Sequence, residues 1–214
     1  HELRTPLAVV RSGLESVEKC SNEEERNHFL HLMSEETVHM KRLIDDMLLL
    51  ANSDADTLTI KPEACQPDLL LLDTYEKFET LAKKNGLHLI LTLPEEILPD
   101  CFCDIHRTEQ IFSIIVDNAL CYTPSGGKVT LSCHAENEML CFLFEDTGCG
   151  ISEEKKSHIF ERFYRADDAH TDREHFGLGL CIAKELTEKQ NGNIQVVDAP
   201  ISGSCFMVQL PCAL

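Results

Sequence analysis

The chain has 214 residues, of which 37 are acidic and 19 basic, so its formal net charge is −18. With 43% hydrophobic and 26% charged side chains it has a globular composition, and it is long enough for one ordinary domain and a smaller element. The excess of negative charge excludes a general nucleic-acid binder, and no apolar run approaches the roughly 18 residues that a membrane-spanning helix needs.

Two helices are predicted for residues 1–53. Apolar side chains recur in the first at spacings of four and three residues, and the second repeats this seam. Between them, Ser21 or Asn22 is placed to cap the second helix, with glutamates in its first turn. Because a single hairpin buries such a seam poorly, we expect a second copy of the chain to complete a four-helix bundle. The seam consists of Leu3, Leu7, Val10, Leu14 and Val17, then Phe29, Met33, Glu36, Met40, Leu43, Met47 and Leu50.

A polar linker is predicted for residues 54–66, and residues 67–214 then alternate between helical and strand patterns. Gly86 is placed to end the first helix of this region. The fold class is therefore α+β, a two-helix hairpin followed by a mixed α/β domain. The predicted helices cover residues 68–85, 107–122, 152–163 and 178–190, and the predicted strands cover 88–93, 101–104, 128–134, 139–145, 194–198 and 205–210.

Eleven cysteines raise the question of disulfide bonds or a metal site. The number is odd and no C-x-x-C is present, so neither a disulfide framework nor a zinc finger is indicated. Cys101, Cys103 and His106 lie close in sequence, but they lack a fourth ligand at finger-type spacing. Others, such as Cys133 and Cys141, lie in apolar alternating stretches where cysteine serves as a small hydrophobic side chain. We therefore expect reduced thiols, as in a cytosolic protein.

The first turn of the chain carries a reactive group. If Leu3 and Leu7 face the bundle, His1 and Thr5 lie on the outer face one turn apart, with Glu2 beside the histidine. An exposed imidazole next to a carboxylate is arranged as a nucleophile with a base or an orienting partner. Taken alone, the same pattern also fits a solvated histidine at a chain end.

Two glycine-rich turns follow further along the chain. The first, D-T-G-C-G at 146–150, follows a predicted buried strand, so its glycines let the backbone approach a ligand while Asp146 accepts a hydrogen bond. The second, G-L-G at 177–179, opens a predicted helix, where backbone N–H groups and the helix dipole favour phosphate oxygens. Each turn alone is a weak signal, because glycines are common in both settings.

The order of these segments resembles the bacterial sensor histidine kinases. H-E-L-R-T-P-L at 1–7 is similar to their H box. D-N-A at 117–119, the 146–150 turn, I-F-E-R-F-Y-R at 159–165 and the 177–179 turn are similar to their N, G1, F and G2 boxes, in family order. G-S-C-F at 203–206 resembles the last glycine box, so the resemblance covers essentially the whole chain. It implies a dimerisation and phosphotransfer hairpin over 1–53 and a catalytic domain over 67–214. That domain would be a two-layer α/β sandwich of the Bergerat ATP-binding type, shared with gyrase, the ninety-kilodalton heat-shock chaperone and the mismatch-repair ATPases.

The resemblance also implies roles for individual residues, with ATP and Mg²⁺ as cofactors. Asn118 would bind Mg²⁺, Asp146 would recognise adenine, and Arg165 would stabilise charge on the transferring phosphoryl group. The stretch between Gly150 and Gly177 would be a mobile lid, anchored by Phe160 and Phe163. The remaining residues implied to line the nucleotide site are Tyr122, Gly148, Gly150, Gly177, Leu178 and Gly179.

A histidine kinase of this kind would phosphorylate His1, with Glu2 as base or orienting group, and pass the phosphoryl group to an aspartate in the receiver domain of a response regulator. Glu2 and Thr5 match the family's E-x-x-T phosphatase motif, in which Thr5 would orient a water. Because the chain begins inside a predicted helix and without Met, we expect a fragment of a longer protein. It would be the cytoplasmic portion of a sensor that reaches the cell membrane only through a missing N-terminal region.

Three departures from the family pattern bear on activity. Ile114 stands where the N box commonly has its first Asn, Cys121 where it has a Lys, and His175 replaces the usual first Gly of the G2 box. Loss of the polar or cationic group could cost on the order of 1–3 kcal/mol of charge-assisted bonding. The alternative function is therefore a nucleotide-binding module with a weak kinase step, acting mainly as a regulator phosphatase or scaffold. An ATPase acting on other substrates is a third reading, which the H box argues against.

Overall fold

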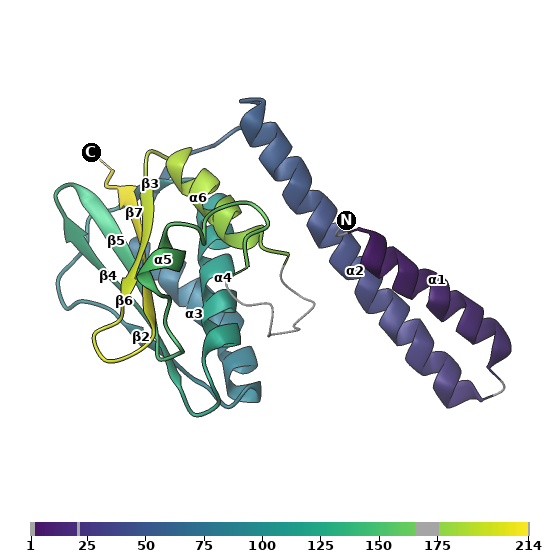
Figure 1. Ribbon diagram of the computed structural model, residues 1–214. Coiled ribbons are helices and arrows are strands. Elements are labelled where there is room, and N and C mark those ends of the chain that lie inside the picture. The colour runs from purple at the N-terminus through teal and green to yellow at the C-terminus, as the bar shows by residue number, and fades with distance from the viewer. Residues whose placement is uncertain (1–2, 21, 166–175, 214) are drawn as a thin grey trace. The chain divides into compact units, whose positions relative to one another are not determined.

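The computed structural model describes residues 3–20, 22–165 and 176–213. They form two compact units, one containing residues 3–58 and the other the described residues from 59 to 165 and from 177 onward. Figure 1 shows a pair of helices in the first unit and a sheet covered by helices in the second, as predicted for an α+β chain. Within the described ranges, no helix combines the length and hydropathy that crossing a bilayer requires.

The first unit is a helical hairpin of α1 (Arg4–Lys19) and α2 (Glu23–Asp54). The side chain of Asn22 caps α2 by accepting a hydrogen bond from the backbone N–H of Glu24 at 3.0 Å. Three glutamates occupy the first turn of α2, where the positive end of the helix dipole stabilises their negative charges. The predicted cap at Asn22 is thus confirmed, whereas Ser21 lies outside the described residues.

The contact between the two helices of the hairpin uses small side chains of α1. A Cβ atom on Gly13 would lie 2.6 Å from Cγ of Met33, so glycine is what lets α1 approach α2 this closely. Pro6 is buried in the first turns of α1, where the missing proline N–H is tolerated. Leu7 and Leu14, two members of the predicted seam, are 57% and 54% exposed. The seam is therefore only partly used within one hairpin.

The second unit is built on a five-stranded sheet with the strand order β2-β4-β5-β7-β6. β2 and β4 run parallel, and the other neighbouring pairs run antiparallel. The central strand β5 has mostly buried side chains, as its apolar composition predicts. The strands are β2 (His88–Thr92), β4 (Lys128–Glu136), β5 (Met139–Asp146), β6 (Asn193–Asp198) and β7 (Ser204–Pro211).

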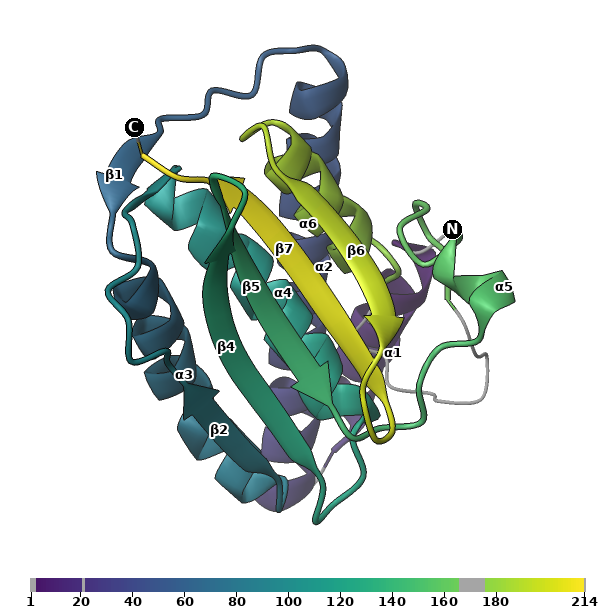
Figure 2. The same cartoon turned by 90° about the vertical axis from the view of Figure 1, so that its left-hand side faces the viewer.

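Three helices, α3 (Pro67–Lys84), α4 (Ile105–Tyr122) and α6 (Gly179–Glu188), cover one face of this sheet. In Figure 2 the strands lie in front of them, so the unit is the predicted two-layer sandwich. The core between the layers centres on Phe112 of α4, whose ring centroid lies 4.8 Å from that of Phe142 and 5.0 Å from that of Phe144. Gly86 ends α3 with a left-handed φ of +71°, as predicted.

A short strand, β1 (Glu63–Cys65), lies within the range predicted as a linker. It pairs antiparallel with β3 (Cys101–Cys103) in a separate two-stranded sheet. Just before β1, the backbone N–H of Lys61 donates to Oδ2 of Asp104 at 2.9 Å. These bonds fasten the segment entering the second unit onto the start of α4.

The predicted helix over 152–163 is wrong in length, because α5 covers only Glu153–Lys156. Beyond it, the ring of Phe160 packs edge-on against Phe206 with centroids 6.5 Å apart. Phe163 then adopts a left-handed φ of +63°, which a continuing right-handed helix excludes. The chain therefore turns back toward the sheet instead of continuing as a helix.

Candidate functional site

The end of β5 presents a buried carboxylate. Asp146 is 6% exposed, and its Oδ1 accepts a hydrogen bond from the backbone N–H of Gly148 at 2.8 Å. Burial raises the pKa of Asp146 above its ordinary value, while backbone hydrogen bonds from Gly148 and Ser204 oppose that shift. Backbone N–H groups hold this carboxylate in one orientation, and it is shielded from water. It is therefore suited to accept a hydrogen bond from a ligand group such as an amino group.

Glycines allow three segments to meet around this carboxylate. A Cβ atom on Gly148 would lie 2.5 Å from the carbonyl oxygen of Tyr122 at the end of α4. One on Gly203, in the loop between β6 and β7, would lie 2.1 Å from the carbonyl oxygen of Asp146 and 2.6 Å from its Oδ1. Gly150 and Gly203 also have φ values of +72° and +88°. Space therefore requires glycine at 148, backbone conformation favours it at 150, and both apply at 203.

The last turns of α4 carry the polar side chains of the site. Nδ2 of Asn118 donates to the carbonyl oxygen of Ile114 at 2.9 Å, which fixes the amide plane and leaves Oδ1 as an acceptor. Asn118 is half-buried, and Tyr122 at the end of the helix is 43% exposed. An oriented amide oxygen beside open surface fits a hard cation that keeps most of its water.

The start of α6 lies against the same part of α4. Gly177 has a left-handed φ of +71°, Leu178 is the N-cap residue, and α6 begins at Gly179. A Cβ atom on Gly179 would lie 3.2 Å from Cγ2 of Ile114, one turn before Asn118. The first N–H groups of an α-helix have no partner within that helix. Those of α6 therefore belong to the same site as Asn118, and they favour an anion.

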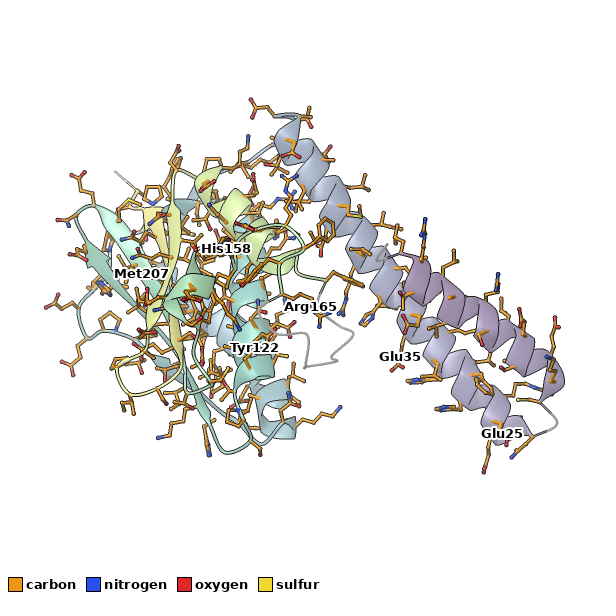
Figure 3. All side chains as sticks on the ribbon, in the orientation of Figure 1. Glu25, Glu35, Tyr122, His158, Arg165 and Met207 are labelled. Carbon is orange, nitrogen blue, oxygen red and sulfur yellow. The ribbon has the colours of Figure 1, made fainter. Side chains whose placement is uncertain are left out.

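A backbone hydrogen bond joins the middle of the predicted lid to its C-terminal end. The N–H of Phe163 donates to the carbonyl oxygen of Gly177 at 2.9 Å. The Phe163 side chain is 50% exposed, so of the two predicted anchors only Phe160 packs on the sheet, and Phe163 acts through its backbone. In Figure 3 the labelled Tyr122 and Arg165 lie on the helical side of the domain, and Met207 lies on the strand side.

Comparison with known proteins decides which family this geometry belongs to. Residues 103–214, more than half of the chain, match the family described as histidine kinase-, DNA gyrase B- and HSP90-like ATPases, and residues 1–56 match the His Kinase A (phospho-acceptor) domain. The chain belongs to the histidine-kinase branch of this ATPase family.

Curated relatives match nearly the whole length of the chain. The adaptive-response sensory kinase SasA of Rippkaea orientalis is 31% identical over 219 residues, which cover 99% of this chain and 56% of SasA. The sensor protein SrrB of Staphylococcus aureus is 32% identical over 216 residues, covering 99% of this chain and 36% of SrrB. Full-length ShkA, solved in complex with AMPPNP, has a TM-score of 0.79 and 27% identity, covering 100% of this chain and 44% of ShkA. The chain therefore spans about half or less of these proteins.

The structure of the histidine-kinase chain brings most of the predicted site residues together. Asn118, Tyr122 and Asp146 lie around the turns at 146–150 and 177–179, and the G-S-C-F segment at 203–206 closes on Asp146. Thr5 is exposed on α1 in the first unit. His1, Glu2 and His175 lie outside the described residues, and the roles assigned to all these residues stay predictions.

One contribution to the site was missed by sequence reasoning. Nζ of Lys156 in α5 lies 2.8 Å from Oδ1 of Asp198 at the end of β6, and it also pairs with Glu153. The hydrogen bond to Asp198 is the main cause that raises the pKa of Lys156. This pair fastens the segment after Gly150 to the strand that leads into the Gly203 loop. No local pattern signals it, because the partners lie far apart in sequence.

Proposed function

We propose that this chain is the catalytic part of a sensor histidine kinase, which phosphorylates His1 from ATP and passes the phosphoryl group to an aspartate of a response-regulator receiver domain. The observation that carries the proposal is the meeting of the buried Asp146 with the Gly148 and Gly203 backbones and the end of α4, in a chain whose first residues form an H box. AMPPNP in the structure of ShkA supports a nucleotide as the ligand.

The arrangement suggests how ATP is held. The Asp146 carboxylate accepts a hydrogen bond from the adenine amino group. The N–H groups at the start of α6, from Leu178 on, receive phosphate oxygens with help from the helix dipole. Arg165 supplies positive charge to the γ-phosphoryl oxygens, as positioned cations do in phosphoryl transfer.

In the transfer step a neutral ring nitrogen of His1 attacks the γ-phosphorus of ATP. The bond from that phosphorus to the bridging oxygen breaks, and ADP leaves with the electron pair. The Glu2 carboxylate hydrogen-bonds the N–H of the other ring nitrogen, which orients the ring, and accepts this proton as the transfer proceeds. The receiver aspartate later attacks the same phosphorus, the phosphorus–nitrogen bond breaks, and the imidazole leaves with the electron pair and regains its proton.

The residues present fit Mg²⁺ as the accompanying ion. Asn118 offers one oriented amide oxygen, and a single protein ligand with water and phosphate oxygens suits this ion. When bound, Mg²⁺ would neutralise charge on the phosphates of the nucleotide.

We further propose a homodimer formed through the hairpin, with the regulator binding close to His1 and a phosphatase activity in which Thr5 orients a water. The exposed Leu7 and Leu14 support the dimer, because they leave part of the seam available to a second copy. The excess of negative charge argues against nucleic acid as a partner. The chain would lie in the cytoplasm, where ATP is available, within a longer sensor anchored in the cell membrane.

A second candidate function is supported by the contact of Ile114 with the start of α6. There an apolar side chain faces the predicted phosphate site in place of the family's usual asparagine. A module that binds nucleotide but transfers phosphate poorly would act mainly as a regulator phosphatase or scaffold.

Incubating the full-length protein with γ-labelled ATP and Mg²⁺ separates the two functions. Acid-labile, base-stable label that disappears in His1→Gln is expected for the kinase. Measurable ATP binding without any label would reject the kinase and leave the second function.

Thr5→Ala should slow regulator dephosphorylation while sparing self-phosphorylation, and equal loss of both would contradict the role assigned to Thr5.

A further inference from the structure

Three cysteine side chains converge at the pair of strands that opens the second unit. Cys101 and Cys103 lie on the same face of β3, and both are fully buried. Cys65 of β1 is directly opposite Cys101 in the strand register and is half-buried. The Sγ atoms of Cys65 and Cys103 are 3.4 Å apart, and the three Sγ atoms all lie within 4.8 Å of one another.

These separations suit three sulfur atoms that share one metal ion. With metal–sulfur bonds of about 2.3 Å, sulfurs around a common ion lie about 3.8–4.0 Å apart. A disulfide bond needs sulfurs about 2.05 Å apart and would use only two of the three. The cluster therefore needs smaller movements to hold an ion than to close a disulfide, and the half-buried Cys65 provides a side from which an ion can enter.

The donor set restricts the kind of ion. Thiolates select soft ions, of which monovalent copper, zinc and iron–sulfur clusters are the usual occupants. Structural zinc sites and iron–sulfur clusters use four protein ligands. Across the residues that the structure describes, no further His, Cys, Asp or Glu joins these three. His106 is close to Cys101 and Cys103 in sequence but does not join them, because its side chain is 93% exposed and pairs with Glu109 at 3.6 Å.

We propose that Cys65, Cys101 and Cys103 form a site for one monovalent copper ion, held by three thiolates. Binding releases the thiol protons and joins β1 to β3 through the ion, in addition to the backbone ladder. Because β1 lies only a few residues after the first unit ends, the ion would fix the point at which the chain enters the catalytic domain. This proposal is independent of the proposed kinase function.

A second group of possible ligands makes a useful contrast. His134, Glu136 and Cys141 also have ligand atoms within 4.8 Å of one another. Nε2 of His134 lies 3.9 Å from Oε2 of Glu136, so an ion pair accounts for this group without a metal. The three thiols are held only by weak hydrogen bonds: the Sγ atoms of Cys65 and Cys103 lie 3.4 Å apart, and Sγ of Cys65 donates to the carbonyl oxygen of Cys101 at 3.5 Å. The alternative to a metal site is therefore a group of protonated thiols packed as small side chains and joined by these weak bonds.

The test is a titration of the reduced full chain with monovalent copper under anaerobic conditions, in competition with a copper(I)-specific chelator such as bathocuproine disulfonate. One tightly bound equivalent is expected, and X-ray absorption should show a first shell of sulfur only. Cys65→Ser should weaken binding at least about tenfold, since even changes to groups that orient metal ligands cost that much. The half-buried Cys65 is the preferred variant because it disturbs the core least.

Three control variants should retain the bound equivalent: Cys133→Ser, which removes a buried thiol elsewhere, Cys149→Ser, which removes an exposed one, and His134→Gln, which removes the second group. Hydrogen exchange at Glu63–Cys65 should slow on copper addition and should not slow in Cys65→Ser. The proposal is overturned by undiminished binding in Cys65→Ser, by loss of copper in His134→Gln, by preference for zinc, or by no tight equivalent at all. Thermal unfolding of each copper-free variant shows that it is folded.

Discussion

Asp146 carries its charge in a place where burial opposes it. Its pKa is raised above the ordinary value mainly because the side chain is removed from water. A raised pKa means that the folded protein holds the proton more strongly than the unfolded chain does. Protonation therefore favours folding, and the charged form costs stability above the raised pKa. The residue is thus arranged for binding rather than for stability of the free protein.

Replacing Asp146 with Asn should separate these two effects. We expect ATP affinity to fall about tenfold or more, because a charge-assisted bond of about 1.5–3 kcal/mol is lost. The unfolding midpoint of the nucleotide-free protein should stay unchanged or rise. Calorimetric titration measures the ATP affinity, and thermal unfolding measures the midpoint. On acidification, the wild type should lose ATP affinity more steeply than the variant, since ATP itself titrates equally in both; parallel pH profiles would contradict the assignment.

Gly203 and Gly126 offer a matched pair for testing close packing around Asp146. Both have a left-handed φ, +88° and +84°, but a Cβ on Gly126 would meet nothing within 4 Å, whereas one on Gly203 would collide with Asp146. Gly126→Ala should cost about 1–2 kcal/mol of unfolding free energy from the backbone alone. Gly203→Ala should cost about 3 kcal/mol or more, because overpacking adds to that strain. Chemical denaturation compares them, and equal losses would show that only the backbone conformation matters.

At the level of elements, Asp104 joins three parts of the second unit. Its Oδ1 accepts from the N–H of Arg107 at 3.2 Å and so caps α4, while its Oδ2 accepts from Lys61 at 2.9 Å. Its own N–H donates to Oε1 of Gln190, just beyond α6, at 2.7 Å. One side chain and its backbone thus hold the entry segment, the start of α4 and the end of α6 together.

Removing the Asp104 carboxylate should loosen the entry segment. Asp104→Ala is expected to lower the unfolding free energy by about 1–3 kcal/mol, since two backbone donors lose their acceptor. Hydrogen exchange over residues 59–65 should accelerate at the same time. Asn22→Ala removes a cap of α2 and should cost roughly 0.5–2 kcal/mol, without changing exchange over 59–65. The same acceleration in both variants would contradict a local role for Asp104.

The contact between α4 and α6 permits a test of the two unusual residues of the N box. Ile114 reaches Gly179 at the start of α6, and Cys121 lies one residue before Tyr122. Ile114→Asn combined with Cys121→Lys should raise the autophosphorylation rate about tenfold, as a polar group and a cation are restored near the phosphates. His106→Lys adds the same charge at the far end of α4 and should change little. An unchanged rate in the double variant would show that the departures are already compensated.

How much of the fold the sequence predicts depends on how local the cause is. The cap at Asn22, the stop at Gly86 and the strands beside β5 follow from neighbouring residues, and the structure confirms them. β1 was missed because three residues acquire strand geometry only by pairing with β3. The end of α5 was missed because Phe160 turns toward Phe206, a partner that no local pattern identifies.

The candidate site shows the same division. Each glycine turn was visible, but alone neither indicates a nucleotide, and only their order along the chain connected them to the histidine kinases. The approach of Gly203 to Asp146 and of Ile114 to Gly179 depends on how the layers pack. The convergence of Cys65 on Cys101 and Cys103 likewise needs the pairing of β1 with β3, which the sequence pattern does not specify.

At the scale of the whole molecule, the hairpin exposes leucines that a single chain does not cover. Leu7 is 57% and Leu14 is 54% exposed on α1, while α1 meets α2 at Gly13, against Met33. Leu7 and Leu14 are seven residues apart, which places them on one face of α1 at the spacing of a coiled-coil seam. A second hairpin would bury them, and each leucine removed from water contributes about 1.5–3 kcal/mol to association.

Leu14→Lys should therefore shift the chain toward monomer. We expect the dimer dissociation constant, measured by sedimentation equilibrium, to rise at least about tenfold. The reason is that a buried apolar contact is replaced by two lysines of like charge that face each other across the symmetry axis. The matched control is Ile97→Lys, which places the same charge on a fully exposed isoleucine of the second unit, 100% accessible, and should leave dimerisation unchanged. Circular dichroism confirms that the helices persist in both. If Leu14→Lys dimerises as the wild type does, the leucines at 7 and 14 do not form the dimer contact.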